Sequence, residues 1–431
     1  MKKMIALVLA ICLTAGCLIS CGEDKPAATQ KPTTAPATET PSADNSVESA
    51  TPESSETPDA TETPKITETP KITGTPKATE TPKVTETPKA TEKPKATDRP
   101  ILPVDYECNT EKFTNPIAPK DTPDPFITYD AETGYYYALY TMVDRIVLLR
   151  HKYVAKVLSE GESKLIYKAT ATGENDVWGD VWAPEMHRGT DGLWYIYSSS
   201  RVTKEEGGKQ IFVLGSSTSD PFTSEWVFKG RPLGNEYGID PTIYTAPNGT
   251  RYMCYSGFNQ YGQVLKIAKM KNEYTCESPR MIAKAELDWE LVPPYVNQYA
   301  ILEGAFFVQK NGRLFIIYSA NGCWSDHYAL GVLEFTGSNM LSAKSWTKSP
   351  KPLMVLGNGV YGPGHASFFY SPDNSEIWCA YHGMSQTNTT VSWAPRYCHL
   401  QKVEFDKTGY PVMGKPIGSN VQIAPPSGER K

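Results

Sequence analysis

One short pattern recurs five times between residues 120 and 410 of this chain. Each copy starts with a phrase that carries an acidic or imidazole side chain. It continues through a turn that contains Gly or Asn and ends in a strand rich in aromatic residues. The polar residues of successive phrases lie 55 to 63 residues apart, and a repeat of this kind is typical of one blade of a β-propeller. The five phrases are Asp124-Pro125-Phe126, Trp182-Ala183-Pro184-Glu185, Ile239-Asp240-Pro241, Leu302-Glu303-Gly304 and Gly364-His365-Ala366.

The repeat predicts an all-β fold, a five-bladed β-propeller. Equivalent positions on the innermost strands of a propeller converge on one axis, so the five phrases should bring their polar side chains to a common central site. We expect residues 101–115 and 410–423 to help close the ring, because an open propeller exposes bare strand edges. The predicted blades occupy roughly residues 120–175, 178–230, 236–290, 298–345 and 360–410.

Residues 1–20 have the features of a lipoprotein signal peptide. Two lysines at positions 2 and 3 precede an apolar run over residues 4–15, which is too short to span a bilayer. The run ends in two lipobox-like phrases, and the one before Cys21 has the better pattern because Leu18 stands three residues before it. We expect lipidation of Cys21, with Cys17 as the other candidate. An ordinary cleaved signal with incidental cysteines is the alternative.

Residues 21–103 contain almost no side chains that could form a core. Thr, Pro, Glu, Lys, Ala and Ser dominate, and from Pro58 to Pro100 a proline recurs every six residues. Such a segment is expected to be a disordered spacer, partly in the polyproline II conformation. At ~3.1 Å per residue in that conformation it could reach on the order of 200 Å. We expect it to hold the domain at residues 104–425 outside the cell, tethered to the membrane only through the lipid.

The net charge bears on the class of partner, and the length bears on the number of domains. The formal net charge is −5 and no basic stripe is present, which argues against nucleic-acid binding. Residues 104–425 suffice for one large propeller domain. We expect this domain to act as a monomer.

Four of the five phrases carry a carboxylate, and three of these, at Asp124, Asp240 and Glu303, are the catalytic candidates. A proline follows each Asp and biases it towards an extended backbone, and Gly304 leaves room beside Glu303. Each motif alone is commonly a turn, so the signal lies in their matching places in separate repeats. Three carboxylates around one pocket suit glycosidic bond cleavage, which needs one acid and one base. Neighbouring negative charges raise the pKa of one carboxyl, which keeps it protonated near neutral pH.

These phrases resemble glycoside hydrolase family 43, the five-bladed inverting arabinofuranosidases, arabinanases and xylosidases. The resemblance runs from about residue 115 to about residue 416 and includes residues 345–349 and 361–365. It implies that Asp124 is the general base and Glu303 the general acid. It implies that Asp240 sets the pKa and the position of the acid.

The resemblance also implies substrate contacts at His365, Arg396 and Trp182. His365 matches a histidine near a metal or water cluster in the central channel. In many members that ion is calcium, so the resemblance implies a possible calcium ion in the central channel, contacted by His365 through waters. We expect no cofactor to be required. Arg396 matches an arginine that lines the pocket of related exo-acting enzymes, but the residues after it differ from the family phrase and leave the role of His399 open. Trp182 is expected to form a wall of the substrate site, with burial between blades as the alternative.

The sequence therefore predicts an inverting enzyme that releases terminal α-L-arabinofuranosyl residues from arabinan or arabinoxylan fragments of the plant cell wall. A β-xylosidase or an endo-arabinanase is the alternative on the same fold. A carbohydrate-binding propeller without catalysis is an alternative of another class, although the presence of all three acids argues against it. Glu185 and His382 are expected to have structural roles.

Overall fold

The computed structural model describes residues 106–431 except for residues 206–207, 294–299 and 389–391. The predicted signal peptide, the spacer at residues 21–103 and Cys21 lie outside these residues. Helical structure in the described part is limited to 3-10 turns of three residues each. No helix there is long and apolar enough to cross a membrane. The prediction of an all-β fold is confirmed for this part of the chain.

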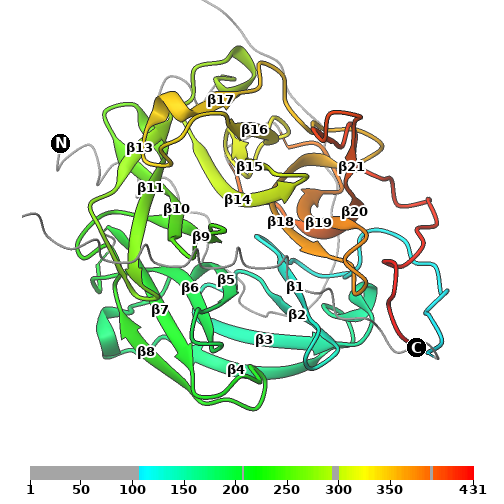
Figure 1. Cartoon of the computed structure of the whole chain (residues 1–431), viewed down its shortest axis with the longest axis horizontal. Coiled ribbons are helices and arrows are strands. Elements are labelled where there is room, and N and C mark those ends of the chain that lie inside the picture. Colours follow the sequence, from blue (N-terminus) through cyan, green and yellow to red (C-terminus); the bar gives the residue numbers. More distant parts are fainter. Residues whose placement is uncertain (1–105, 206–207, 294–299, 389–391) are drawn as a thin grey trace, which may run out of the picture. The chain divides into compact units, whose positions relative to one another are not determined.

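Five antiparallel sheets follow one another along the described chain, together with one small two-stranded sheet (Figure 1). The first contains β1 (Phe126–Asp130), β2 (Tyr135–Leu139), β3 (Arg145–His151) and β4 (Glu162–Lys168), and the second β5 (Trp182–Arg188), β6 (Trp194–Arg201), β7 (Lys209–Ser216) and β8 (Trp226–Gly230). The third contains β9 (Ile239–Thr245), β10 (Arg251–Asn259), β11 (Gly262–Asn272), β12 (Thr275–Cys276) and β13 (Arg280–Ala283), and the fourth β14 (Leu302–Lys310), β15 (Arg313–Ala320), β16 (Ala329–Phe335) and β17 (Trp346–Lys348). The fifth contains β18 (Tyr361–Tyr370), β19 (Ile377–Met384) and β20 (Tyr397–Lys402), and the small sheet pairs β21 (Glu404–Phe405) with β22 (Pro411–Val412).

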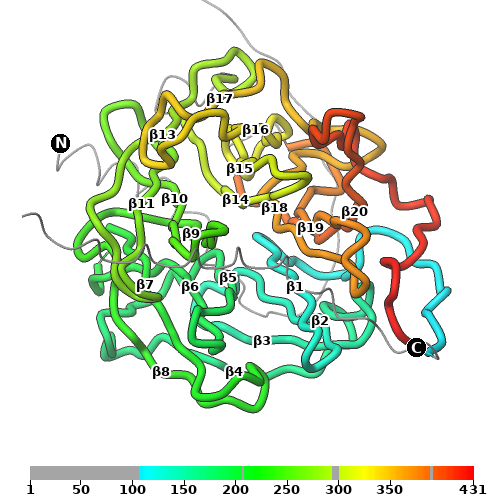
Figure 2. Tube along the Cα trace, in the orientation of Figure 1, coloured from blue at the N-terminus to red at the C-terminus, as the bar shows by residue number. Residues whose placement is uncertain are grey.

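The five sheets are arranged as blades around one centre. Strands β1, β5, β9, β14 and β18 lie nearest the centre in Figures 1 and 2. Each of these inner strands contacts the next, and β18 contacts β1, so the ring is closed. The predicted five-bladed β-propeller is confirmed, and each predicted blade contains the strands of one sheet, except that β17 lies just beyond the predicted end of the fourth blade at residue 345.

The segment before the first blade completes the ring at the fifth blade. The Asn115 side chain accepts the N–H of Leu400 and donates to its carbonyl oxygen, at 2.8 and 2.9 Å. It therefore hydrogen-bonds to the outer strand β20 as a neighbouring strand would. Phe113 and Ile423 form an antiparallel bridge, which joins this segment to the C-terminal tail. The two ends of the described chain thus cover the edge that an open ring would expose.

Aromatic side chains fill the axis of the propeller. Phe126, Phe306 and Phe368 come from three inner strands, with ring centroids 6.4 and 5.7 Å apart in that order. The His187 ring lies 5.6 Å from that of Phe126. These rings belong to or pack on the largest buried apolar cluster, so the hub is a packed core.

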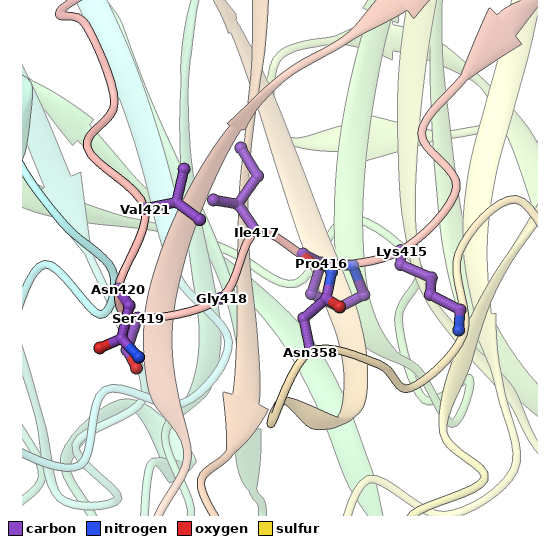
Figure 3. A pocket seen from close by; sticks show the side chains of 8 residues that line it. All are labelled: Asn358, Lys415, Pro416, Ile417, Gly418, Ser419, Asn420 and Val421. Carbon is purple, nitrogen blue, oxygen red and sulfur yellow. Dashed lines mark hydrogen bonds between the residues drawn. The ribbon is translucent and has the colours of Figure 1, made fainter.

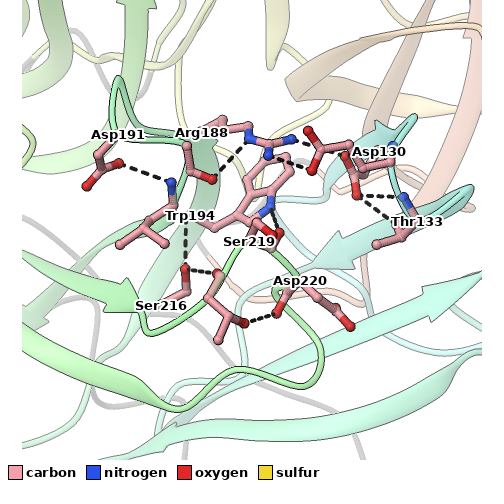
Figure 4. Close-up of polar contacts among 12 residues, drawn as sticks. Asp130, Thr133, Arg188, Asp191, Trp194, Ser216, Ser219 and Asp220 are labelled. Carbon is pink, nitrogen blue, oxygen red and sulfur yellow. Dashed lines mark hydrogen bonds and ion pairs between the residues drawn. The ribbon is translucent and has the colours of Figure 1, made fainter.

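Polar contacts on the turns also join neighbouring blades. Arg188 of β5 lies 3.6 Å from Asp130 at the end of β1, and its guanidinium carbon is 5.5 Å from the centre of the Trp194 ring (Figure 4). Trp194 in turn donates its indole N–H to the carbonyl oxygen of Ser219 at 2.9 Å. Partly exposed ion pairs contribute only ~0.2–1 kcal/mol. The blades are therefore held together mainly by the apolar surfaces between them.

Candidate active site

In or just before each inner strand, one residue of the repeated phrase adopts the left-handed backbone region. A non-glycine residue with positive φ is uncommon and costs about 1–2 kcal/mol, so the four non-glycine positions in this ring, together with Gly304, mark a constrained site. Shifts of strand register accompany this conformation in β5, β14 and β18, and such bulges re-aim side chains. The residues and their φ angles are Asp124 (54°), Ala183 (43°), Asp240 (55°), Gly304 (55°) and His365 (47°).

This arrangement corrects two sequence-based expectations. Asp124 and Asp240 are left-handed and not extended, because tertiary hydrogen bonds override the bias of the following proline. The five polar residues also do not share one structural position. Glu303 lies one residue before the left-handed Gly304, and Glu185 lies two residues after the left-handed Ala183.

A side chain from the preceding blade accepts the backbone N–H of three of the left-handed residues. The acceptor always stands near the end of the second strand of its blade. Such a bond satisfies a buried donor and holds the strained conformation in place. The bonds run from Ala183 to Thr141 Oγ1 (2.7 Å), from His365 to Ser319 Oγ (2.8 Å) and from Asp124 to His382 Nδ1 (3.0 Å).

His382 is a contact of Asp124 that the sequence analysis assigned to structure alone. A signal for it exists, because a Tyr lies in or just after the second strand of each blade, and the next residue is a hydroxyl-bearing side chain in four blades and a histidine in the fifth. The residues after these tyrosines are Thr141, Ser198, Ser256, Ser319 and His382.

Asp124 is held by cationic and polar groups on both carboxylate oxygens. Thr141 donates its hydroxyl to Oδ2 at 2.6 Å. Oδ1 lies 3.1 Å from Arg396 Nη1, 3.3 Å from His365 Nδ1 and 3.4 Å from His382 Nδ1. Burial alone would raise the pKa of Asp124, but Arg396, followed by His365, outweighs it and holds the pKa well below its ordinary value. Asp124 is therefore a carboxylate.

Glu303 is a buried carboxyl with the opposite tendency. Tyr328 donates its hydroxyl to Oε1 and Gln263 donates its amide to Oε2, both at 3.0 Å. These two donors favour the charged form, but burial outweighs them and the negative charge of Asp124 adds to it, so the pKa of Glu303 rises to about 7. Sequence analysis identified neither Tyr328 nor Gln263, because each lies on a strand or loop far along the chain from Glu303.

Asp240 lies beside the backbone of Glu303. Its Oδ2 accepts the N–H of Gly304 at 3.1 Å. Burial, and then the charge of Glu303, raises the pKa of Asp240 well above its ordinary value. Gly304 is required here, because it has positive φ and a Cβ atom would lie 3.0 Å from Cγ of His365. The structure therefore brings Asp124, Asp240 and Glu303 into one electrostatically linked group.

One stacked pair of rings connects the two ends of this group. The Tyr328 ring lies parallel to the His382 ring, with centroids 5.5 Å apart and an interplanar angle of 9°. His382 bonds the backbone of Asp124, and Tyr328 bonds the side chain of Glu303. The positions of Asp124 and Glu303 are thus coupled through packed side chains.

The other residues predicted to contact substrate lie at this site or next to it. Arg396 and His365 both contact Asp124. One face of the Trp182 ring is covered by Lys209, whose Nζ lies 3.9 Å from the ring centre and 2.6 Å from Asp180. A sugar could therefore stack only on the other face of Trp182.

The described residues do not fit a calcium ion bound directly by side chains. Calcium takes six to eight oxygen ligands, and no group of three or more His, Cys, Asp or Glu suited to a metal occurs among them. The Nδ1 atom of His365 is directed to Asp124. His365 thus contacts the carboxylate of Asp124, and a calcium ion held beside it through waters stays a prediction.

Glu185 lies below this group and contacts the aromatic hub. Its Oε2 is 2.7 Å from Nε2 of His187. Burial, with a smaller contribution from Asp240, raises the pKa of Glu185 well above its ordinary value, and burial lowers the pKa of His187 to about 3. Burial thus disfavours the charged form of both partners.

A separate open pocket lies along the C-terminal tail (Figure 3). Residues 415–421 and Asn358 line it, and the Asn358 side chain donates to the carbonyl oxygen of Pro416 at 2.8 Å. No carboxyl side chain is among these lining residues. This pocket therefore does not contain Asp124, Asp240 or Glu303.

The hydrogen bonds predict opposite tautomers for two buried histidines. His382 Nδ1 accepts the Asp124 N–H, so its proton should be on Nε2, whereas His399 Nδ1 lies 2.8 Å from the carbonyl oxygen of Tyr397 and must carry the proton. Burial lowers the pKa of His382 to about 3 and that of His399 to about 4. In nitrogen NMR spectra of histidine-labelled protein, the His382 ring should carry its proton on Nε2 and the His399 ring should carry its proton on Nδ1. Neither ring should gain a second proton between pH 7 and pH 5. An Nδ1-protonated His382 would contradict the Asp124 contact, with His399 as the internal control.

Comparison with known proteins agrees with this geometry. The model of the family described as glycosyl hydrolases family 43 matches residues 113–411. An extracellular exo-alpha-(1->5)-L-arabinofuranosidase of Streptomyces avermitilis is 34% identical over 72% of this chain, and the match spans 64% of that relative, just under two thirds. A protein of the same name from Streptomyces chartreusis is 33% identical, over 63% of this chain and 82% of the relative. The crystal structure of an alpha-L-arabinofuranosidase from Lactobacillus brevis superposes with a TM-score of 0.65 at 26% identity, over 72% of this chain and 98% of that one. Because the family model covers nearly the whole propeller, and with it all three predicted acids, this chain belongs to glycosyl hydrolases family 43.

Proposed function

We propose that this protein is an inverting, exo-acting hydrolase that releases terminal α-L-arabinofuranosyl residues from arabinan or arabinoxylan fragments. The observation that carries the proposal is the opposite protonation of two carboxyls in one buried group. The pKa of Asp124 is held well below its ordinary value, and burial raises that of Glu303 to about 7. An inverting glycosidase needs this combination of a charged base and a protonated acid.

Each acid then has a separate role in a single displacement. Asp124 takes a proton from the water that attacks the anomeric carbon, and Glu303 gives its proton to the departing glycosidic oxygen. Asp240 accepts the N–H of Gly304 and so fixes the backbone that carries Glu303. Arg396 holds one oxygen of Asp124 and keeps this carboxylate charged.

The choice of arabinose is supported by the names of the relatives. Two of them are named exo-acting arabinofuranosidases. Solved structures named as a xylan beta-1,4-xylosidase and an endo-arabinase are 17% and 20% identical, so they share the fold alone. The two carboxyls of opposite protonation favour hydrolysis over a propeller that only binds carbohydrate. One chain supplies every residue of the site, which supports action as a monomer.

Neutralising either acid should abolish hydrolysis. We expect Asp124→Asn and Glu303→Gln to lower kcat on α-1,5-L-arabinotriose by about 10²–10⁴-fold, the usual contribution of a general base or acid. Circular dichroism and thermal unfolding should stay close to those of the parent protein, because the side-chain volumes barely change. The exposed Glu404→Gln is the matched control.

Full activity in either variant would refute these assignments. Products from debranched arabinan should be L-arabinose alone, since internal cleavage would identify an endo-acting enzyme. Faster cleavage of an aryl β-xyloside than of an aryl arabinofuranoside would favour the xylosidase alternative.

The pH profile should report the hydrogen bond from Tyr328 to Glu303. Because Glu303 must be protonated to act, kcat/KM should fall as pH rises through about 7. The Tyr328 hydroxyl stabilises the charged form of Glu303, so Tyr328→Phe should raise its pKa and move this alkaline limb to higher pH. Tyr318→Phe removes a phenol that bonds Glu290 and should leave the limb in place. A limb that stays fixed or moves to lower pH in Tyr328→Phe would exclude Glu303 as the acid.

We further propose that the protein is secreted and held at the cell surface by a lipid on Cys21. The apolar run at residues 4–15 and the lipobox-like phrase before Cys21 support this, as do relatives named extracellular. Triacyl chains bury many methylenes at ~0.8 kcal/mol each and retain a protein firmly. The spacer at residues 21–103 would then separate the propeller from the membrane.

Replacing the lipidated cysteine should release the protein from membranes. In a bacterial host fed radiolabelled palmitate, the parent protein should carry label and sediment with membranes, and Cys21→Ala should do neither. Cys17→Ala is the matched control and should remain labelled. The reverse pattern would transfer the site to Cys17, and no label in any of the three would refute lipid anchoring.

A further inference from the structure

Two tryptophans lie close to Asp124 on segments from different blades. Trp324 lies between β15 and β16, and Trp393 lies between β19 and β20. Their ring centroids are 5.5 Å apart, with an edge-to-face angle of 68°. The guanidinium carbon of Arg396 is 5.2 Å from the centre of the Trp393 ring, and the same guanidinium contacts Asp124. Trp324 and Trp393 are called the Trp pair below.

The two segments that carry the Trp pair are fastened to each other. Asp326 accepts the N–H of Asn388 at 2.5 Å and also bonds the hydroxyl of Thr387. Asn388 in turn donates its side-chain amide to the carbonyl oxygen of Trp324 at 2.7 Å. Asp326 and Asn388 are both buried, so these bonds are shielded from water. The Trp324 backbone is therefore held in place, and a residue held in this way loses little conformational entropy when it binds a ligand.

Local packing also restrains the Trp324 ring. A Cβ atom at Gly322 would lie 2.6 Å from this ring, so the ring packs on bare backbone. The ring therefore has a defined position beside Trp393. Tyr328, four residues further on, donates to Glu303. The Trp pair is thus linked to Asp124 through Arg396 and to Glu303 through the segment that carries Tyr328.

Trp393 is more exposed to solvent than the carboxyl groups. Trp393 is 42% exposed, whereas Glu303 and Asp240 are 9% and 7% exposed. The sugar unit that is cleaved must reach the depth of the carboxyls. The unit attached to it then lies nearer the solvent, at the level of Trp393. An exo-acting enzyme takes the terminal unit first, so this outer unit belongs to the leaving chain.

We propose that the Trp pair binds the first sugar unit of the leaving chain, next to the bond that is cleaved. An aromatic face accepts the apolar C–H face of a sugar ring, while the sugar hydroxyls remain in water. The cationic group beside Trp393 is already paired with Asp124, which favours a neutral ligand over an anionic one. This inference rests on the proposed function and adds to it a site that selects oligosaccharides over simple glycosides.

Kinetics on two substrates test the Trp pair. α-1,5-L-Arabinotriose carries a leaving chain that reaches the Trp pair, whereas the leaving group of methyl α-L-arabinofuranoside is too small to do so. Trp393→Ala should lower kcat/KM for arabinotriose by about tenfold, the scale of losing an aromatic anchor, and mainly through KM. The value for the methyl glycoside should change less than twofold. Trp393→Phe should keep most of the activity on arabinotriose.

Controls separate this inference from the proposed function. Tyr370→Ala removes an aromatic side chain of similar exposure at the far end of β18 and should leave both substrates unaffected. An equal loss on both substrates would mean that Trp393 only supports Arg396, and no loss on arabinotriose would mean that it binds nothing; either overturns the inference. If the parent protein cleaves neither arabinoside, the proposed function itself fails, and the inference fails with it. Should Trp393→Ala not fold, Trp324→Ala is judged by the same ratio of the two substrates.

Discussion

The site depends on hydrogen bonds that hold a left-handed residue at the start of inner strands. Such a residue is strained, so a neighbour must stabilise it. The preceding blade does so for Asp124, Ala183 and His365 through a side chain near the end of its second strand. The contact between the first and fifth blades that closes the ring therefore also fixes the backbone of the site at Asp124. In an open ring the Asp124 N–H would lose His382, its acceptor from the fifth blade.

Burial acts on all three acids, but their neighbours decide the outcome. Asp124 is surrounded by Arg396, two imidazoles and a hydroxyl, and it remains charged. Glu303 has two neutral donors, which only partly oppose burial, so its pKa is raised to about 7. A propeller can produce this difference because adjacent blades supply different second-strand and loop residues to one axis. The same hub then holds one charged carboxyl and one with a raised pKa, the combination on which the proposed function rests.

Sequence analysis identified the blades, the three acids and the residues Arg396 and His365, all of which the structure places in one group. Their catalytic roles remain predictions. It did not identify Tyr328 or Gln263, and it assigned His382 to structure. Tyr328 lies on a loop and Gln263 at the start of a second hairpin, and neither position has a repeated motif. Whether such a side chain reaches a given carboxyl depends on how two blades pack.

The sequence by itself determined that there are five blades, because a hydrophobic and turn pattern of fixed period allows few other folds. It also determined which carboxyl and imidazole side chains the repeated phrases bring near the axis. Only the tertiary structure decided the backbone at Asp124 and Asp240, where the preference of a residue before proline gave way to hydrogen bonds between blades. It likewise decided which acid is charged, because a pKa depends on burial and on partners that are hundreds of residues away in the chain.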